Sequence, residues 1–263
     1  MSSQTAQSAG YNEFIEEHER EAACRALLTT YLASIGQEPV DRNAEELFSL
    51  NSGVCDRFNY FVPRMPESAR RRLLVSGCAA GSEMIIARRF GFQEILGTEV
   101  VQDYVQITNQ RVVGQLGFCA LLYDGRNLPF ADNTFTSIVS GHIIEHTPSP
   151  YRYLREHIRV LAPGGFMFLE FPDRYNRIEL HTGLPSLEYL PEPFRSLGLR
   201  WRASRFSSLP PDRRRGYDAI RRTLKPVSVW QISSYLLRTP FRNPRIVHHY
   251  SPIPGYTRML ITK

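Results

Sequence analysis

The sequence predicts an α/β fold whose strands are mostly parallel, and two stretches of the chain support this prediction. Residues 73–99 have the pattern of strand, tight turn, helix and second strand. Residues 118–173 have the pattern of strand, polar turn, strand, helix and strand. A strand, a crossover helix and a further strand join parallel neighbours through a right-handed connection. We therefore expect the two stretches to build one sheet.

The first 68 residues are expected to form a disordered tail followed by a helical cap. Residues 1–10 are polar and are expected to be disordered. Between residues 11 and 34, five glutamates lead into apolar residues at helical spacing, which predicts a helix. A second helix is expected at about residues 44–60, before two prolines. The cap either covers a ligand site or packs without a role in binding.

The first predicted strand, residues 73–76, ends in a turn of small residues that enters a helix at residues 82–89. Small residues let the backbone approach a ligand, and a helix N-terminus offers N–H groups to a negative charge. The second strand, residues 95–98, ends at Glu99, which lies 22 residues past Gly77. At an offset of roughly 20 residues, a carboxylate in such folds accepts hydrogen bonds from ribose hydroxyls.

Three further strands are predicted in the second stretch. Residues 118–123 are apolar, as in a strand buried on both faces, and a loop of turn formers leads to a strand at residues 137–140. Ser149 and Pro150 provide an N-cap and a first helical residue, and a Pro-Gly-Gly run ends that helix. A strand at residues 166–171 follows.

Several short runs in this stretch occur in the order and spacing of a known family. They are Asp124, Leu128-Pro129-Phe130, Asp132 and Phe135, then Glu145-His146, then Arg159-Val160-Leu161-Ala162-Pro163-Gly164-Gly165. The chain thereby resembles the class I S-adenosylmethionine-dependent methyltransferases over about residues 73–172, in particular the subgroup with small-molecule and glycan acceptors. The resemblance implies a Rossmann-like fold with a mostly parallel seven-stranded sheet and an antiparallel C-terminal hairpin. It also implies S-adenosylmethionine as the cofactor.

The resemblance implies roles for residues at the ends of the strands. Glu99 would bind the ribose, Asp124 would bind the adenine amino group, and the backbone N–H of Gly125 would reach a ring nitrogen. The methionine part and the reactive methyl group would lie at the end of the fourth strand. The expected cofactor contacts are Gly77, Cys78, Ala79, Gly81, Glu99, Val100, Asp124, Gly125, Ser140 and Gly141.

Two residues depart from the family pattern. Val75 stands where the family usually has an acidic residue, and Ala79 stands where it usually has glycine. The methyl group of Ala79 is tolerable if its φ angle stays negative. We expect cofactor binding to survive but to weaken.

Four residues are candidates for the acceptor side, and no metal site is expected. His146 and His142 are candidate general bases for an acceptor hydroxyl, although His146 also fits a role in packing the next helix. Glu179 and His181 belong to a run that resembles an insert of some bacterial methyltransferases, and a solvent-facing connector is the alternative.

The remaining chain, residues 69–263, is expected to be the methyltransferase domain, with a lid or acceptor insert at about residues 174–244. A helix is predicted at about residues 227–237, and residues 245–250 and 256–262 would form the closing hairpin. No window approaches the roughly 20 apolar residues of a membrane span, and no signal-peptide pattern opens the chain. We therefore expect a cytoplasmic protein with reduced cysteines.

Positive charge is concentrated in one segment. The net charge is +6, but residues 195–225 hold ten Arg or Lys against two Asp, a surplus of +8, so the rest of the chain carries −2. The segment is either a solvated face or a contact for an anionic partner, such as a phosphate-bearing acceptor. The expected function is O-methylation of a small molecule or glycan precursor. The alternatives are an RNA methyltransferase that uses the basic segment and a non-catalytic regulatory protein.

Overall fold

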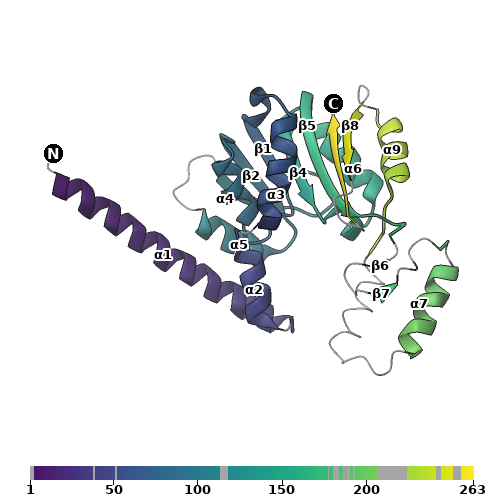
Figure 1. Ribbon diagram of the computed structural model, residues 1–263, viewed down its shortest axis with the longest axis horizontal. Helices are drawn as coiled ribbons and strands as arrows, with labels where there is room; N and C mark the ends of the chain where they lie inside the picture. The colour runs from purple at the N-terminus through teal and green to yellow at the C-terminus, as the bar shows by residue number, and fades with distance from the viewer. Residues whose placement is uncertain are drawn as a thin grey trace.

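The computed structural model describes residues 3–37, 39–50, 52–112, 118–176, 178–179, 184–185, 187, 190–191, 193–205, 224–240, 244–250 and 256–263. Its centre is a seven-stranded sheet with the strand order β3-β2-β1-β4-β5-β9-β8 (Figure 1). The strands are β1 (Arg72–Ser76), β2 (Glu94–Glu99), β3 (Phe118–Leu122), β4 (Phe135–Gly141), β5 (Leu161–Pro172), β8 (Arg245–Tyr250) and β9 (Tyr256–Thr262). Strands β1 to β5 are parallel, and β9 runs antiparallel between β5 and β8. The predicted fold class is confirmed.

Helices cover both faces of this sheet. The helices of the described residues are α1 (Ser3–Ser34), α2 (Val40–Phe48), α3 (Ser52–Phe61), α4 (Ser82–Arg89), α5 (Gln102–Arg111), α6 (Pro150–Val160), α7 (Phe194–Arg205) and α9 (Val229–Leu237). In the central strand β1, Leu73 and Val75 pack in one apolar cluster with α3 and α4, whereas Leu74 packs in a second cluster with α6 and α9. All three side chains are fully buried, as an apolar run in a strand covered on both faces requires.

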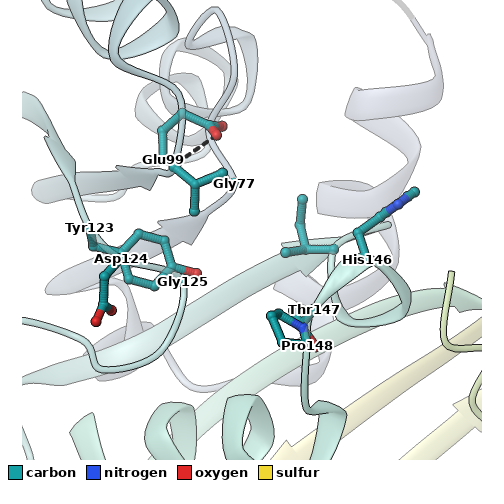
Figure 2. Close-up of a pocket in the computed structure, with 10 residues that line it drawn as sticks. Gly77, Glu99, Tyr123, Asp124, Gly125, His146, Thr147 and Pro148 are labelled. Carbon is teal, nitrogen blue, oxygen red and sulfur yellow. Dashed lines mark hydrogen bonds between the residues drawn. The ribbon is translucent and has the colours of Figure 1, made fainter. Parts of the chain in front are cut away.

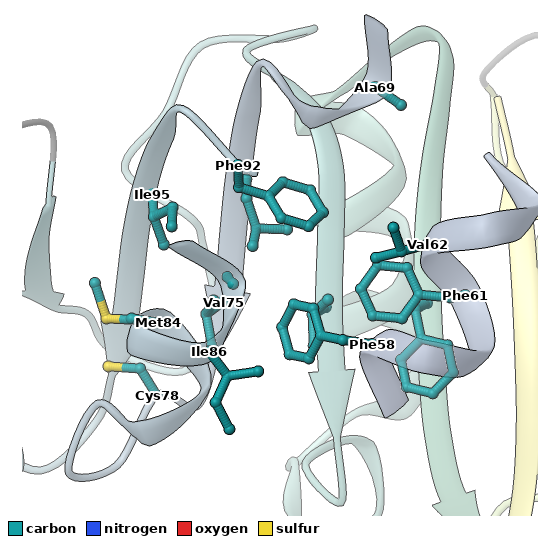
Figure 3. Close-up of a cluster of buried hydrophobic side chains, with 14 of the residues drawn as sticks. Phe58, Phe61, Val62, Ala69, Val75, Cys78, Met84, Ile86, Phe92 and Ile95 are labelled. Carbon is teal, nitrogen blue, oxygen red and sulfur yellow. The ribbon is translucent and has the colours of Figure 1, made fainter. Parts of the chain in front are cut away.

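Aromatic side chains fill the layer between the sheet and α3. The rings of Phe58 and Phe61 have their centres 5.0 Å apart, and Phe61 stacks on Phe168 of β5 at 5.0 Å (Figure 3). Phe92, which precedes β2, completes the cluster. Truncation of one such buried ring to alanine costs about 3–5 kcal/mol. The N-terminal cap therefore packs against the core through a large apolar contact.

The helices differ from the predictions at several places. α1 begins at Ser3 rather than near residue 11, because residues 3–10 contain alanine and glutamine and no proline. The single helix expected at residues 44–60 is two helices, since Ser49 is extended with φ −64° and ψ 130° and ends α2. α5 was not predicted, because most of its residues are polar.

The described residues hold no helix long and apolar enough to cross a membrane. Cys24, Cys55, Cys78 and Cys119 are free thiols, as predicted.

In this strand order, the carboxyl ends of β1 and β4 lie side by side, and the chain leaves the two strands toward opposite faces of the sheet. Such a point is where open α/β sheets bind ligands.

Candidate functional site

A turn with positive φ angles joins β1 to α4. Gly77, Ala79 and Gly81 have φ of 71°, 43° and 84°. The N–H groups of Gly77 and Cys78 both donate to the carbonyl of Thr98 on β2, at 2.8 and 3.1 Å. These bonds tie the turn to the neighbouring strand. Gly77 also lines the adjacent cavity, and its positive φ is one that glycine adopts without strain.

The condition under which the methyl group of Ala79 was tolerable, a negative φ, is not met, because φ is 43°. A side chain in the left-handed region costs about 1 kcal/mol. The N–H of Ala79 donates to Oε2 of Glu99 at 3.1 Å, and the hydroxyl of Thr108 donates to its carbonyl. Both peptide groups of Ala79 are thus bonded, which holds the residue in this conformation.

Glu99 is a buried carboxylate that binds three backbone N–H groups. Besides Ala79, it accepts from Val100 at 2.7 Å and from Val101 at 3.3 Å, both at Oε1. A carboxylate has about four lone-pair sites, so three bonds leave one acceptor site on Oε2. The side chain is 8% exposed and lines the cavity. It is fixed in orientation and retains the capacity to accept a hydroxyl group.

A cavity of about 360 Å³ lies beyond the carboxyl ends of β1, β2 and β3 (Figure 2). Pockets for small ligands start at roughly 300 Å³. Figure 2 shows Glu99, Tyr123 and Asp124 on one side, and His146, Thr147 and Pro148 on the other. The residues that line the cavity are Gly77, Glu99, Val100, Tyr123, Asp124, Gly125, Ile143, His146, Thr147 and Pro148.

Asp124 begins a tight loop at the end of β3. Its Oδ1 accepts N–H groups from Arg126 at 2.8 Å and Asn127 at 2.9 Å. The bonds from Asn127 and Arg126 lower the pKa of Asp124 below its usual value, so the side chain is a carboxylate at neutral pH. Among the described residues no group bonds Oδ2, which remains available to a ligand. Gly125 has a φ of 70° beside it.

Five of the expected cofactor contacts, with His142, do not line this cavity. They are Cys78, Ala79, Gly81, Ser140 and Gly141. The hydroxyl of Ser140 is buried and bonds the Tyr153 hydroxyl at 2.7 Å, which also bonds Ser76 at 2.8 Å. Burial raises the pKa of the Cys78 thiol, whose side chain packs toward Gly97. Ser140 and Cys78 therefore belong to the interior, and Ala79 acts through its bond to Glu99.

A charged cluster that the sequence did not predict covers Gly141. A Cβ atom on Gly141 would lie 3.0 Å from Cζ of Arg57, which pairs with Glu83 and with Glu170 at 2.6 Å. Arg258 also pairs with Glu170. Burial raises the pKa of Glu170, but the bond from His142 and the charge of Arg57 outweigh it and lower the pKa to about 2. The sequence signal that could have revealed this cluster is Glu170, a glutamate inside an otherwise apolar strand.

His142 and His146 lie on either side of a buried carboxylate. The turn η3 (Ile144–His146) places Oε1 of Glu145 at 3.7 Å from Nδ1 of His142 and 4.0 Å from Nε2 of His146. Within the described part of the chain, neither oxygen of Glu145 has a hydrogen-bond partner, although the residue is fully buried. Burial lowers the pKa of His142, but Glu145 and Glu170 outweigh it and raise the pKa. His146 is 43% exposed and lines the cavity.

The acceptor-side candidates in the insert are only partly described. Glu179 lies in β6 (Ile178–Glu179), which pairs with β7 (Leu184–Pro185), and His181 lies outside the described residues. Within the described part of the chain, no group of three or more His, Cys, Asp or Glu is placed to hold a metal ion. Tyr123, Ile143, Thr147 and Pro148 line the cavity without having been predicted.

The strand order, the glycine turn and the carboxylates at the ends of β2 and β3 define a class of enzyme, the methyltransferases of the Rossmann-like fold. The methyltransferase domain family matches residues 74–169. This part of the chain is a class I S-adenosylmethionine-dependent methyltransferase domain.

Comparison with known proteins gives distant relatives. A ubiquinone/menaquinone biosynthesis C-methyltransferase of Desulfotalea psychrophila is 27% identical over 135 residues, 46% of this chain and 54% of that protein. Ajmaline N-methyltransferase of Rauvolfia serpentina is 26% identical over 41% of this chain and 38% of that protein. The chain thus spans about half the length of these relatives or less. An S-adenosylmethionine-dependent methyltransferase from Mesorhizobium loti has the same fold, with a TM-score of 0.60, 14% identity, and coverage of 82% of this chain and 100% of that one.

The residues present fit S-adenosylmethionine. Gly77 lines the cavity at the end of β1, Glu99 keeps one acceptor site, and Asp124 keeps Oδ2. Val75, in place of the family's acidic residue, is fully buried between strands and leaves no unpaired charge.

Proposed function

We propose that this protein transfers a methyl group from S-adenosylmethionine to a hydroxyl oxygen of a small molecule or sugar. The observation that supports it is the cavity itself, in which cofactor-type residues on one side face the exposed His146 on the other. Methyl transfer is the activity of the class to which the domain belongs, and we propose it here for the whole protein. A cytoplasmic location is part of the same proposal.

S-adenosylmethionine supplies an activated methyl group on a sulfonium. The chain's own residues would bind and align the reactants, which is the main source of rate in such a transfer. Glu99 and Asp124 hold one end, and Ile143 and Gly77 shape the floor of the cavity. His146 would take the proton of an acceptor hydroxyl, a contribution of roughly 10²- to 10⁴-fold. The buried carboxylate of Glu145, 4.0 Å away, would stabilise the charged ring.

The test has two parts. Calorimetry with the demethylated product, S-adenosylhomocysteine, should show binding at one site, and Asp124→Ala should weaken it. A transfer assay with labelled methyl donor against host extracts should then give labelled products whose linkage, to oxygen, nitrogen or carbon, is read by mass spectrometry. His146→Ala should lower turnover about 100-fold or more while leaving product binding unchanged. Products that carry the labelled methyl group on carbon or nitrogen would overturn O-methylation, but they would leave the assignment to the methyltransferases intact.

The RNA alternative rests on the basic segment at residues 195–225, of which residues 206–223 lie outside the described part. No described contact favours it over a small acceptor. The identification of the domain as a methyltransferase argues against a purely regulatory protein.

A further inference from the structure

The insert between β5 and α9 carries a helix whose exposed face is apolar. On α7, the side chains of Phe194, Leu197 and Trp201 are 64%, 67% and 57% exposed. Spacings of three and four residues place them on one face of a helix. A Cβ atom on Gly198 would lie 2.9 Å from Cδ1 of Leu187, so α7 contacts the insert at Gly198, while the three apolar side chains stay exposed.

Positive charge accompanies this apolar face. α7 contains four arginines and no acidic residue, and Arg200 is exposed. The whole of residues 195–225 carries the surplus of +8. Aromatic and aliphatic side chains on one helix face, with arginines around them, are typical of helices that lie in the headgroup layer of a bilayer. Tryptophan prefers that layer, and anionic headgroups complement the arginines.

Both ends of the insert are fixed beside the cavity. Asp173 and Val227 form a bridge at the carboxyl end of β5. The N–H of Lys225 donates to the carbonyl of Glu145 at 2.6 Å, and its Nζ bonds the carbonyl of Pro148, which lines the cavity. Figure 1 shows α7 away from the sheet, on the side to which the carboxyl ends of β1 to β5 point. A surface that binds α7 would therefore lie on the acceptor side.

We propose that α7 is a docking surface for an anionic phospholipid bilayer. Phe194, Leu197 and Trp201 enter the headgroup layer, and the exposed Arg200 contacts lipid phosphates. A nucleic acid fits less well, because Leu197 gains nothing from a sugar-phosphate backbone. A second copy of the chain fits less well too, because it would bring the same positive charge against α7. The proposal does not depend on the reaction, since its readout is binding.

The full chain is mixed with vesicles of phosphatidylcholine and phosphatidylserine in a ratio of about 3:1, and with pure phosphatidylcholine, and the bound fraction is measured by sedimentation. Trp230→Phe leaves Trp201 as the sole tryptophan, so its emission reports insertion directly. Leu197→Glu and Arg200→Glu are the test variants. Leu27→Glu on α1, where the leucine is 46% exposed, and Arg89→Glu on α4 are matched controls. Circular dichroism verifies that each variant is folded.

We expect binding to the anionic vesicles, a blue shift of Trp201 emission, and a loss of about tenfold or more in partitioning for each test variant, with the controls unchanged. Added salt should weaken binding because it screens the charges. Absence of binding at saturating lipid would overturn the proposal. So would equal loss in the control variants, binding to single-stranded RNA in place of vesicles, or a dimer in sedimentation velocity that Leu197→Glu dissolves without any vesicle binding.

Discussion

Ile143 covers Gly77 so closely that a Cβ atom on the glycine would lie 2.2 Å from Cδ1 of the isoleucine and 2.7 Å from Cγ1. Both residues line the cavity, one from the turn after β1 and the other from the turn after β4. The two halves of the sheet thus meet at this pair. The absence of a side chain at one position allows the large side chain at the other.

Gly77→Ala should therefore destabilise the fold and remove cofactor binding. The φ of 71° and the contact with Ile143 both oppose a methyl group, and together they should lower the free energy of unfolding by about 2 kcal/mol or more. Urea unfolding measures this loss. The double variant with Ile143→Ala removes the steric contribution and leaves the backbone strain, so it should recover part of the loss. No recovery would show that the isoleucine contact is irrelevant.

Ala79→Gly should stabilise the protein. The alanine holds a φ of 43°, which glycine adopts without strain, so the free energy of unfolding should rise by about 0.5–1 kcal/mol. Ala80→Gly is the matched control, because Ala80 is buried without a positive φ and this variant should be less stable than the wild type. Thermal unfolding of the two variants compares them. A less stable Ala79→Gly variant would contradict the strain inferred here.

Glu99→Ala should weaken both folding and cofactor binding. The side chain accepts N–H groups from Ala79, Val100 and Val101, so its loss should cost about 1–3 kcal/mol of stability and a similar amount of binding free energy. Glu99→Gln retains one acceptor oxygen and should lose less of both. Calorimetry with S-adenosylhomocysteine and urea unfolding separate the two effects. Unchanged affinity in both variants would place the ribose elsewhere.

Much of the fold was predictable because its determinants are local. The β1 run Leu73-Leu74-Val75 is continuously apolar, Ser149 and Pro150 mark the start of α6, and the offset from Gly77 to Glu99 is short. The structure confirms the resulting fold class, a mostly parallel seven-stranded sheet with an antiparallel C-terminal hairpin. Glu99, Asp124 and His146 line the cavity, and they could be named as candidates from the sequence because each lies close to the end of a predicted strand or the start of a predicted helix.

The missed features depend on contacts between distant segments. Arg57 and Glu170 are 113 positions apart, and no local pattern relates them. Ile143 lines the cavity only because Gly77 leaves room for it. Ser140 stands at the predicted strand end, but the pleat directs its hydroxyl toward Tyr153 and away from the cavity. Successive side chains of a strand point to opposite faces of the sheet, and this alternation decides whether a residue such as Ser140 faces the cavity. The prediction from the sequence did not take the alternation into account.

The Glu170 cluster predicts how stability depends on pH. The pKa is lowered from 4.5 to about 2 in the folded state, so the carboxylate stabilises the fold at pH values above 4.5, and this contribution is lost as pH falls from about 5 to about 2. It amounts to about 3 kcal/mol. Glu170→Gln should be less stable at pH 7, because Arg57 and Arg258 lose their partner, and its stability should change less between pH 5 and pH 3. Glu94→Gln, at a residue 51% exposed and paired with Arg72, should keep the wild-type slope. Urea unfolding at pH 7, 5, 4 and 3 measures the three proteins, and a Glu170→Gln variant with the full wild-type slope would assign the acid sensitivity to another group.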